Sequence, residues 1–293
     1  MNDAVFRSSP ILSLYYRGAL SSCNYACSYC PFAKKKDNRR TLDLDAKQLG
    51  DFVNWVESQQ RKVQILFTPW GEALVRKHYR EAVSYLAVLP DVQHVAVQTN
   101  LSGPLSWLGE IPAESRRKIG LWCTFHPTEV SLERFSQRCQ ELRSLGVAHS
   151  VGMVAHHAHL PEVKRLRNAI PISTKMWLNA LSGKEARTYS SEELELCRSI
   201  DPFFDFSASP RPSKGQPCRS GSESLSIDEF GDIRRCHFLP KILGNIAHHL
   251  LEDVLREEPC TRRVCDCFIG YSQRRDLPIF DLFGEGLMAR MAP

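Results

Sequence analysis

Regularly spaced apolar segments, separated by stretches of helix length, constrain the fold of this chain more than any other feature. Runs typical of β-strands lie at residues 11–16, 63–67, 94–98, 121–125, 150–154 and 175–178. Helical patterns lie at residues 45–59, 73–89, 132–145, 161–169 and 191–200. Strands that alternate with helices build right-handed β-α-β units around a parallel sheet. Six such strands predict an α/β fold with an incomplete barrel, since a closed barrel of the TIM type has eight.

Length and composition suit a globular enzyme. With 293 residues, 43% of them hydrophobic and 24% charged, the chain can bury a large core. We expect a main domain at residues 1–205 and a smaller one at residues 206–293. The net charge of +5 is modest, so nucleic acid is not an expected partner.

The eleven cysteines are interpreted as metal ligands and not as a disulfide framework. Residues 1–18 contain no long apolar stretch of the kind found in secretion signals. No segment approaches the roughly 18 consecutive apolar residues that cross a bilayer. We therefore expect a cytoplasmic protein without membrane contact, in a compartment that keeps thiols reduced.

Three cysteines near the start of the chain carry the strongest chemical signal. Cys23, Cys27 and Cys30 stand in CNYACSYC, a Cys-x3-Cys-x2-Cys spacing. Three thiolates can hold three irons of a cubane cluster and leave the fourth iron open, whereas clusters that only carry electrons are usually closed by four ligands. The alternatives are three buried thiols or a zinc knuckle. Zinc usually takes four nitrogen or sulfur ligands at paired spacings, and no histidine follows soon after Cys30.

This spacing is the signature of the radical S-adenosylmethionine (SAM) enzymes, and the chain resembles that superfamily. The resemblance implies a partial (β/α)6 radical SAM barrel, with the cysteines in the loop after the first strand. It implies a 4Fe–4S cluster on Cys23, Cys27 and Cys30 that binds SAM and cleaves it reductively to a 5′-deoxyadenosyl radical. Tyr29 matches the position that meets the adenine, although a lone aromatic residue can also simply pack the loop.

Two further segments resemble the SAM-binding motifs of the superfamily. In TPWGEAL, the residues Trp70, Gly71 and Glu72 resemble the Gly-Gly-Glu segment that binds the methionyl amino group, with Trp70 in place of the first glycine. A glycine lets the backbone approach a ligand closely; the alternative is an ordinary strand-to-helix turn with an exposed glutamate. Thr99 and Asn100 stand where relatives contact the ribose or the methionyl carboxylate. Their alternative is a helix cap or an Asx-turn.

Other polar residues follow the predicted strands, where functional loops of such folds lie. His126, at the end of the fourth strand, is a candidate for substrate contact or proton transfer, or it only shapes the loop before Pro127. Asn179, just past the sixth strand, is a candidate cofactor contact. A histidine cluster with weak metal-ligand spacing follows the fifth strand: His156, His157 and His159.

A second group of cysteines lies near the other end of the chain. Cys218 and Cys236 bracket a predicted β-hairpin with Gly231 in its turn, which would bring the two cysteines together. Three more follow in CTRRVCDC: Cys260, Cys265 and Cys267. The remaining cysteines, inside strand or helix patterns, are expected to be packed thiols: Cys123, Cys139 and Cys197.

This arrangement resembles the SPASM and twitch extensions of radical SAM enzymes, which carry auxiliary iron–sulfur clusters. Five cysteines fit the shorter twitch form, with one auxiliary 4Fe–4S cluster. Twitch relatives usually close that cluster with Cys-x2-Cys, whereas this chain offers Cys-x4-Cys-x-Cys, so one thiol is spare or has a second role. Cys218 and Cys236 are the favoured ligands, and the choice among the other three is open. A Cys-only zinc site is the alternative.

The blocks LYYRGALSSCNYACSYCPFAKK and VCDCFIGY resemble a short bacterial family of radical SAM proteins without an established reaction. A resemblance to radical SAM enzymes implies the reductive cleavage of SAM as the first step, but it does not imply the substrate. Twitch and SPASM relatives oxidise small alcohols such as aminocyclitols, or oxidise and crosslink peptides. We expect an oxidoreductase that acts on a small molecule; a peptide (RiPP-type) maturase with a partner-presented substrate is the alternative. A ferredoxin-like electron carrier and a non-catalytic iron–sulfur or zinc-binding module are further alternatives.

The basic run after the cysteines has two interpretations. It comprises Lys34, Lys35, Lys36, Arg39 and Arg40. Such runs are usually solvated faces. The functional interpretation is a docking surface for an acidic electron donor of the flavodoxin or ferredoxin type, attracted by charge.

Overall fold

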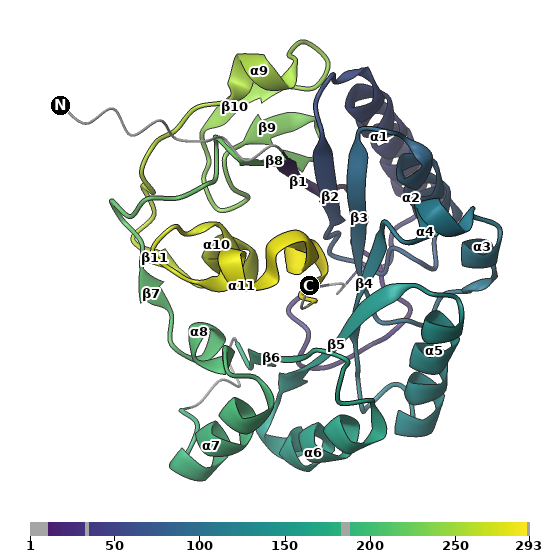
Figure 1. The fold of residues 1–293 in the computed structure, drawn as a ribbon, viewed down its shortest axis with the longest axis vertical. Coiled ribbons are helices and arrows are strands. Elements are labelled where there is room, and N and C mark those ends of the chain that lie inside the picture. Colours follow the sequence, from purple (N-terminus) through teal and green to yellow (C-terminus); the bar gives the residue numbers. More distant parts are fainter. Residues whose placement is uncertain (1–10, 33–34, 183–187, 292–293) are drawn as a thin grey trace.

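The computed structural model describes residues 11–32, 35–182 and 188–291, and its centre is a curved sheet of parallel strands (Figure 1). The parallel strands are β1 Leu12–Arg17, β2 Val63–Phe67, β3 Val92–Thr99, β4 Ile119–Thr124, β5 Ala148–Ala155 and β6 Met176–Ala180. They are hydrogen-bonded in chain order, each parallel to the next. The predicted α/β fold with an incomplete six-stranded barrel is therefore confirmed.

Helices follow the strands and cover the outer face of the sheet (Figure 1). They are α1 Arg39–Ser58, α2 Lys77–Val88, α3 Ser106–Gly109, α4 Ala113–Arg116, α5 Leu132–Ser144, η1 His157–His159, α6 Leu160–Ala169, α7 Ser191–Ile200 and α8 Phe204–Ala208. Apolar residues at helical spacing face the strands. Phe52 of α1, for example, stacks on Tyr16 of β1 with ring centroids 4.5 Å apart. Each fully buried side chain of this size contributes about 1.5–3 kcal/mol to stability.

Two predicted helix boundaries are wrong, for local reasons. The first helix begins at Arg39 and not at residue 45, because the Asn38 side chain accepts a hydrogen bond from the Thr41 backbone N–H at 2.9 Å and caps the helix there. Its first turns are largely exposed, so they carry no apolar pattern. The second helix begins at Lys77, because residues 73–76 form a turn in which the Arg76 N–H bonds to the Ala73 carbonyl.

The C-terminal segment extends the same sheet beyond β1. Strand β8 Ser224–Asp228 pairs in parallel with β1, and β9 Asp232–Arg234 and β10 Ile242–Asn245 follow antiparallel, so that the described residues form a nine-stranded sheet. The predicted hairpin is confirmed as β8–β9, with Gly231 in the turn at a φ of +76°. A separate pair is formed by β7 Arg211–Pro212 and β11 Val264–Cys265. Helix α9 Leu251–Val254 lies beside β10.

The last elements fill the inner side of the curved sheet (Figure 1). They are α10 Phe268–Gln273, α11 Ile279–Phe283 and η2 Gly284–Ala289. Met288 and Ala289 are each 2% exposed and pack in one cluster with Trp122 of β4 and Trp177 of β6. The barrel interior is thus a packed core on this side.

Arg290 follows η2 and is enclosed by aromatic rings. Its guanidinium lies 3.6 Å from the ring centre of Phe268, 4.4 Å from that of Trp177 and 4.7 Å from that of Trp122. Such cation–π contacts are strongest where water is excluded. Burial lowers the pKa of Arg290 to about 10, so the side chain stays charged at neutral pH.

Across the described ranges, no helix combines the length and the apolar character needed to cross a membrane.

Candidate functional site

A cavity of about 510 Å³ lies at the carboxyl ends of the parallel strands. Loops after different strands contribute to its wall because parallel strands end at the same edge of the sheet. All residues predicted for the SAM site line it: Cys23, Cys27, Tyr29, Cys30, Trp70, Gly71, Glu72, Thr99, Asn100, His126 and Asn179. The structure therefore gathers, around one space, residues that are up to 156 positions apart in sequence, from Cys23 to Asn179.

The chain leading into the cysteine loop is held by two aspartates. The Asp37 carboxylate accepts hydrogen bonds from the backbone N–H groups of Ser21 (2.9 Å) and Ser22 (2.8 Å) and from both hydroxyls. Burial raises the pKa of Asp37, but these hydrogen bonds outweigh it and hold the pKa below its usual value. The buried Asp45 accepts from the Leu20 N–H at 2.9 Å. The residues before Cys23 are therefore fixed without metal.

Gly71 fixes the loop from the other side. Its N–H donates to the Leu20 carbonyl (3.1 Å), and the Glu72 N–H donates to the Ser22 carbonyl (3.2 Å). A Cβ atom on residue 71 would lie 2.1 Å from the Ser22 carbonyl oxygen, so no other residue fits here. The sequence predicts that this glycine lets the backbone approach a ligand; in the structure the close approach is to the backbone of Ser22, directly before the first cysteine.

Glu72 is 4% exposed, so the alternative of a turn with an exposed glutamate is wrong. Its Oε1 accepts from the Thr99 hydroxyl (2.6 Å) and the Leu74 N–H (3.0 Å), and its Oε2 accepts from the Asn100 N–H (2.6 Å). Burial raises the pKa of Glu72, and these hydrogen bonds counteract the rise. The carboxylate ties the ends of β2 and β3 together at the cavity wall.

Asn100 faces the cysteine loop. Its side-chain amide lies 3.5 Å from Cys23 Sγ and 3.2 Å from Asn24 Oδ1. Its Oδ1 also accepts from the Ser102 N–H at 3.0 Å, which is the Asx-turn considered as an alternative. One side chain thus shapes the turn after β3 and contacts the loop of the first cysteine.

His126 lies against Cys27 and Tyr29. Its Nδ1 is 3.3 Å from Cys27 Sγ and 3.0 Å from the Tyr29 hydroxyl. The rings of His126 and Tyr29 stack with an interplanar angle of 15°. Burial lowers the pKa of His126 to about 4 and raises the pKa of Cys27 to about 11. In the metal-free protein a neutral imidazole therefore faces a protonated thiol at pH 7.

Trp70 and Asn179 mark opposite parts of the wall. Trp70 is 48% exposed, and its ring meets the edge of the Phe32 ring at 4.9 Å. Asn179 lies within β6 and not past its end, because the strand continues to Ala180. Its Oδ1 is 3.5 Å from both terminal nitrogens of Arg290, which links the cavity to the packed interior.

Sequence reasoning missed several polar residues of the wall, among them Arg17, Gln98 and Thr124. Arg17 and Thr124 are the last residues of β1 and β4, and Gln98 is the penultimate residue of β3. The Arg17 Nε donates to the Thr68 carbonyl at 3.1 Å. The sequence signal that could have identified them is a polar residue at or next to the end of a predicted parallel strand.

Four of the five C-terminal cysteines surround a second, much smaller cavity of about 30 Å³. They are Cys218, Cys236, Cys260 and Cys265. Cys267 does not belong to the lining found among the described residues; it packs against the cluster that contains Tyr15 and Trp122 inside the barrel. Burial raises the pKa of Cys236 to about 12 and that of Cys265 to about 11, so both thiols are protonated without metal.

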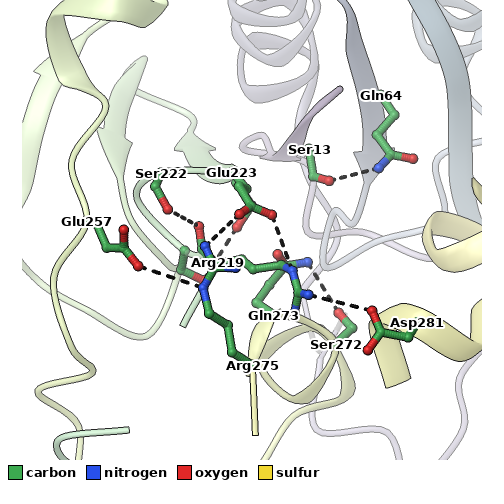
Figure 2. Close-up of polar contacts among 12 residues, drawn as sticks. Ser13, Gln64, Arg219, Ser222, Glu223, Glu257, Ser272, Gln273, Arg275 and Asp281 are labelled. Atoms are coloured by element: carbon green, nitrogen blue, oxygen red, sulfur yellow. Dashed lines mark hydrogen bonds and ion pairs between the residues drawn. The ribbon is translucent and has the colours of Figure 1, made fainter. Parts of the chain in front are cut away.

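Ion pairs around Glu223 lie close in sequence to Cys218 (Figure 2). The buried Glu223 carboxylate accepts from Arg275 at 2.6 Å and from Arg219 at 3.2 Å, and Arg219 also lies 3.7 Å from Asp281. The Arg219 N–H donates to the Gln273 carbonyl at 2.8 Å. The segment that carries Cys218 is thereby fastened to the end of α10, which follows Cys265 and Cys267 directly.

The remaining candidates are buried cysteines and half-buried histidines. The prediction of packed thiols is confirmed, since Cys123, Cys139 and Cys197 are at most 2% exposed. The rings of His156 and His159 lie 4.9 Å apart and both approach Tyr29, whereas His157 lies 3.4 Å from Glu193. In the parts of the chain that the structure describes, no three His, Cys, Asp or Glu side chains are arranged to hold a single metal ion.

No family model and no curated protein matches the sequence. Solved structures of anSMEcpe are similar in fold. Histidine-tagged anSMEcpe with bound AdoMet has a TM-score of 0.56 at 15% identity, covering 84% of this chain and 77% of that chain. Native anSMEcpe with bound AdoMet and the Kp18Cys peptide has a TM-score of 0.58 at 14% identity, covering 85% and 81%.

At this level of identity the likeness concerns the fold. The chain shares the partial α/β barrel of the anSMEcpe structures, with a parallel sheet whose strand ends surround the cavity.

Proposed function

We propose that this protein is a radical SAM enzyme that cleaves SAM reductively and takes a hydrogen atom from a substrate in the same cavity. The observation that carries the proposal is the cavity itself, where the thiols of Cys23, Cys27 and Cys30 share a wall with Glu72. Three thiols from one short loop suit a cluster that keeps one iron open. The anSMEcpe structures of similar fold hold AdoMet.

The residues around this space have distinct roles in the proposed enzyme. A 4Fe–4S cluster on Cys23, Cys27 and Cys30 would supply the electron that splits SAM into methionine and a 5′-deoxyadenosyl radical. Glu72, whose carboxylate is oriented by its hydrogen bonds, would bind the methionyl ammonium. Tyr29 forms the wall for the adenine. Trp70 and Phe32 also line the cavity, where their half-exposed rings meet edge to face.

We also propose that Cys218, Cys236, Cys260 and Cys265 hold one auxiliary 4Fe–4S cluster in a twitch-like domain at residues 206–293. Their shared cavity supports this choice of ligands, because four thiolates close such a cluster completely. Gly270 leaves room for it, since a Cβ there would lie 2.5 Å from Cys265 Sγ. This assignment leaves Cys267 as the spare thiol. An auxiliary cluster can accept the substrate electron, which makes the net reaction an oxidation or a crosslink.

The proposed substrate is a small molecule, and a peptide presented by a partner protein is the second candidate. The peptide stays under consideration because one anSMEcpe structure of similar fold contains the Kp18Cys peptide. Among the described residues, the cavity wall contains three cations and one carboxylate. The cations are Arg17, Lys35 and Lys36, and the carboxylate is that of Glu72. The positive wall suits a substrate that carries negative charge.

The proposed electron donor is an acidic protein of the flavodoxin or ferredoxin type. Lys35, Lys36, Arg39 and Arg40 are exposed beside the cavity mouth and the start of α1; Lys34 lies outside the described residues. Arg39 pairs with Asp43 at 3.8 Å, but both side chains are so exposed that the pair binds weakly. The basic character is therefore available to an incoming acidic surface.

Anaerobic purification and reconstitution test the proposal. A brown protein with about eight irons per chain is expected, because two 4Fe–4S clusters contain that number. With dithionite and SAM it should form 5′-deoxyadenosine, and without dithionite it should not. A colourless protein with stoichiometric zinc, or a fully reconstituted protein that forms no 5′-deoxyadenosine, would refute the proposal.

A further inference from the structure

One nitrogen of His126 meets two polar groups of the cysteine loop. Nδ1 lies 3.3 Å from Cys27 Sγ and 3.0 Å from the Tyr29 hydroxyl. The Tyr29 hydroxyl also interacts with Cys27 and with Thr128. Sulfur, hydroxyl and imidazole thus form a closed triangle beside the cavity.

The chemistry of the sulfur determines how this triangle is bonded. A thiolate sulfur bound to iron only accepts hydrogen bonds. An imidazole that carries an N–H on Nδ1 donates it to this sulfur across the 3.3 Å contact. The Tyr29 hydroxyl is a second possible donor to the same sulfur.

The ring is held firmly enough to keep this orientation. It stacks on Tyr29 with ring centroids 6.0 Å apart and meets Tyr25 edge to face at 5.8 Å. Its backbone carbonyl accepts from the N–H groups of Glu129 (3.0 Å) and Val130 (3.2 Å), which closes the turn after β4. Since Nδ1 is engaged with the loop, the part of His126 left for the cavity is the opposite edge of the ring.

We propose that His126 donates a hydrogen bond from Nδ1 to the sulfur of Cys27 and thereby raises the reduction potential of the cluster held by Cys23, Cys27 and Cys30. This inference rests on the proposed function. The incoming electron adds negative charge to the cluster and its sulfur ligands. A donor fixed in a buried site stabilises the reduced form more than the oxidised form. His126 is thus a tuning residue of the cofactor, a role that differs from the substrate contact or proton transfer considered from the sequence.

The midpoint potential of the cluster tests the inference directly. We expect His126→Phe, which keeps an aromatic ring but lacks the donor, to lower the equilibrium constant of reduction by up to about tenfold, or about 59 mV for a one-electron couple. His126→Asn places an amide near the position of Nδ1 and should retain most of the wild-type potential. His159→Phe is the matched control, because His159 also packs against Tyr29, at 6.2 Å.

The measurement is an EPR-monitored redox titration of the reconstituted full chain without SAM. The first cluster is identified as the one whose signal changes when SAM is added. An unchanged potential in His126→Phe at wild-type iron content would overturn the inference, and so would an equal decrease in His159→Phe. Wild-type protein labelled with ¹⁵N-histidine needs no variant: a ¹⁵N coupling to the reduced cluster is expected, and its absence would also overturn it.

Failure of the inference can be separated from failure of the proposed function. A wild-type protein that assembles no SAM-responsive cluster would refute the proposed function. A SAM-responsive cluster whose potential is insensitive to His126→Phe would refute only the tuning role.

Discussion

The two groups of cysteines differ most in the space around them. Cys23, Cys27 and Cys30 open onto a cavity of about 510 Å³, whereas four C-terminal thiols enclose about 30 Å³. A metal group at the first site has room for a second ligand, and one at the second site does not. The difference supports a division of labour, in which the first site performs the chemistry and the second serves electron transfer or structure.

The two groups also differ in how the fold holds them. The first is one short loop, fixed by Asp37 and by backbone hydrogen bonds to Gly71 and Glu72 in the loop after β2. The second collects residues from 218 to 265 and depends on the ion pairs of Glu223. The first site is therefore prepared locally, and the second is completed only when distant segments have met.

Removal of the first site should have the largest effect. The triple variant Cys23→Ala, Cys27→Ala, Cys30→Ala should form no detectable 5′-deoxyadenosine and should keep about four irons, because the second site remains. Iron analysis and chromatographic quantification of 5′-deoxyadenosine check this. Residual SAM cleavage, or loss of all iron, would mean that the two sites are not independent.

Gly71→Ala should damage the first site nearly as severely. A Cβ 2.1 Å from the Ser22 carbonyl must displace the cysteine loop, and we expect a loss of about 3 kcal/mol in the free energy of unfolding. Urea denaturation of the metal-free protein measures it.

Gly50→Ala is the matched control, because a Cβ at residue 50 meets no atom within 4 Å in helix α1. Alanine at this helical position should stabilise the protein by up to about 1 kcal/mol. Equal behaviour of the two variants would contradict the role of Gly71.

Single serine substitutions should sharpen the ligand set of the second site. Cys260→Ser should lower the iron content from about eight to about four per chain while some uncoupled SAM cleavage persists. Cys267→Ser should keep about eight irons, because Cys267 packs inside the barrel and not at the small cavity. The reverse result would assign the fourth ligand to Cys267.

Acid should lower the stability of the metal-free protein by a smaller amount for each pH unit than Gly71→Ala does. The folded pKa of His126 is about 4, below the usual 6.5, because the ring is buried. Below pH 6.5 the unfolded chain binds a proton that the folded chain does not, so stability is complete above pH 6.5 and falls toward pH 4. Between these pH values, His126 lowers the free energy of unfolding by roughly 1.4 kcal/mol for each unit by which the pH falls.

Urea denaturation at several pH values between about 4 and 7 measures the slope. In His126→Asn the free energy of unfolding should depend less steeply on pH, by the slope that corresponds to about one proton. The same slope in both proteins would show that His126 is not a buried neutral group.

The fold and the first site were predictable from sequence because their signals are local. Strand-to-helix alternation indicates the parallel sheet, and parallel strands bring Tyr29, Glu72, Asn100 and His126 to one edge. Contacts were not predictable. The group that excludes a side chain at Gly71 is the backbone carbonyl of Ser22, 49 positions away. His126 contacts Cys27, 99 positions away.

The second group of cysteines shows the same limit. Spacing alone treats Cys265 and Cys267 alike, whereas in the structure Cys265 lines the small cavity and Cys267 packs against the cluster of Tyr15 and Trp122. The predicted start of the first helix failed for a related reason, since the cap at Asn38 precedes the apolar pattern.

The position of residues 284–291 inside the barrel has a consequence for the order of folding. The inner side chains of β4 and β6, Trp122 and Trp177, are covered by Met288, Ala289 and Arg290, more than 100 positions later in the sequence. Contacts over such separations form slowly, because a long loop must close first. During synthesis on the ribosome, the barrel therefore exposes two tryptophans until residues 284–291 have emerged. Its final closure, and not the sheet itself, should be the late step in maturation.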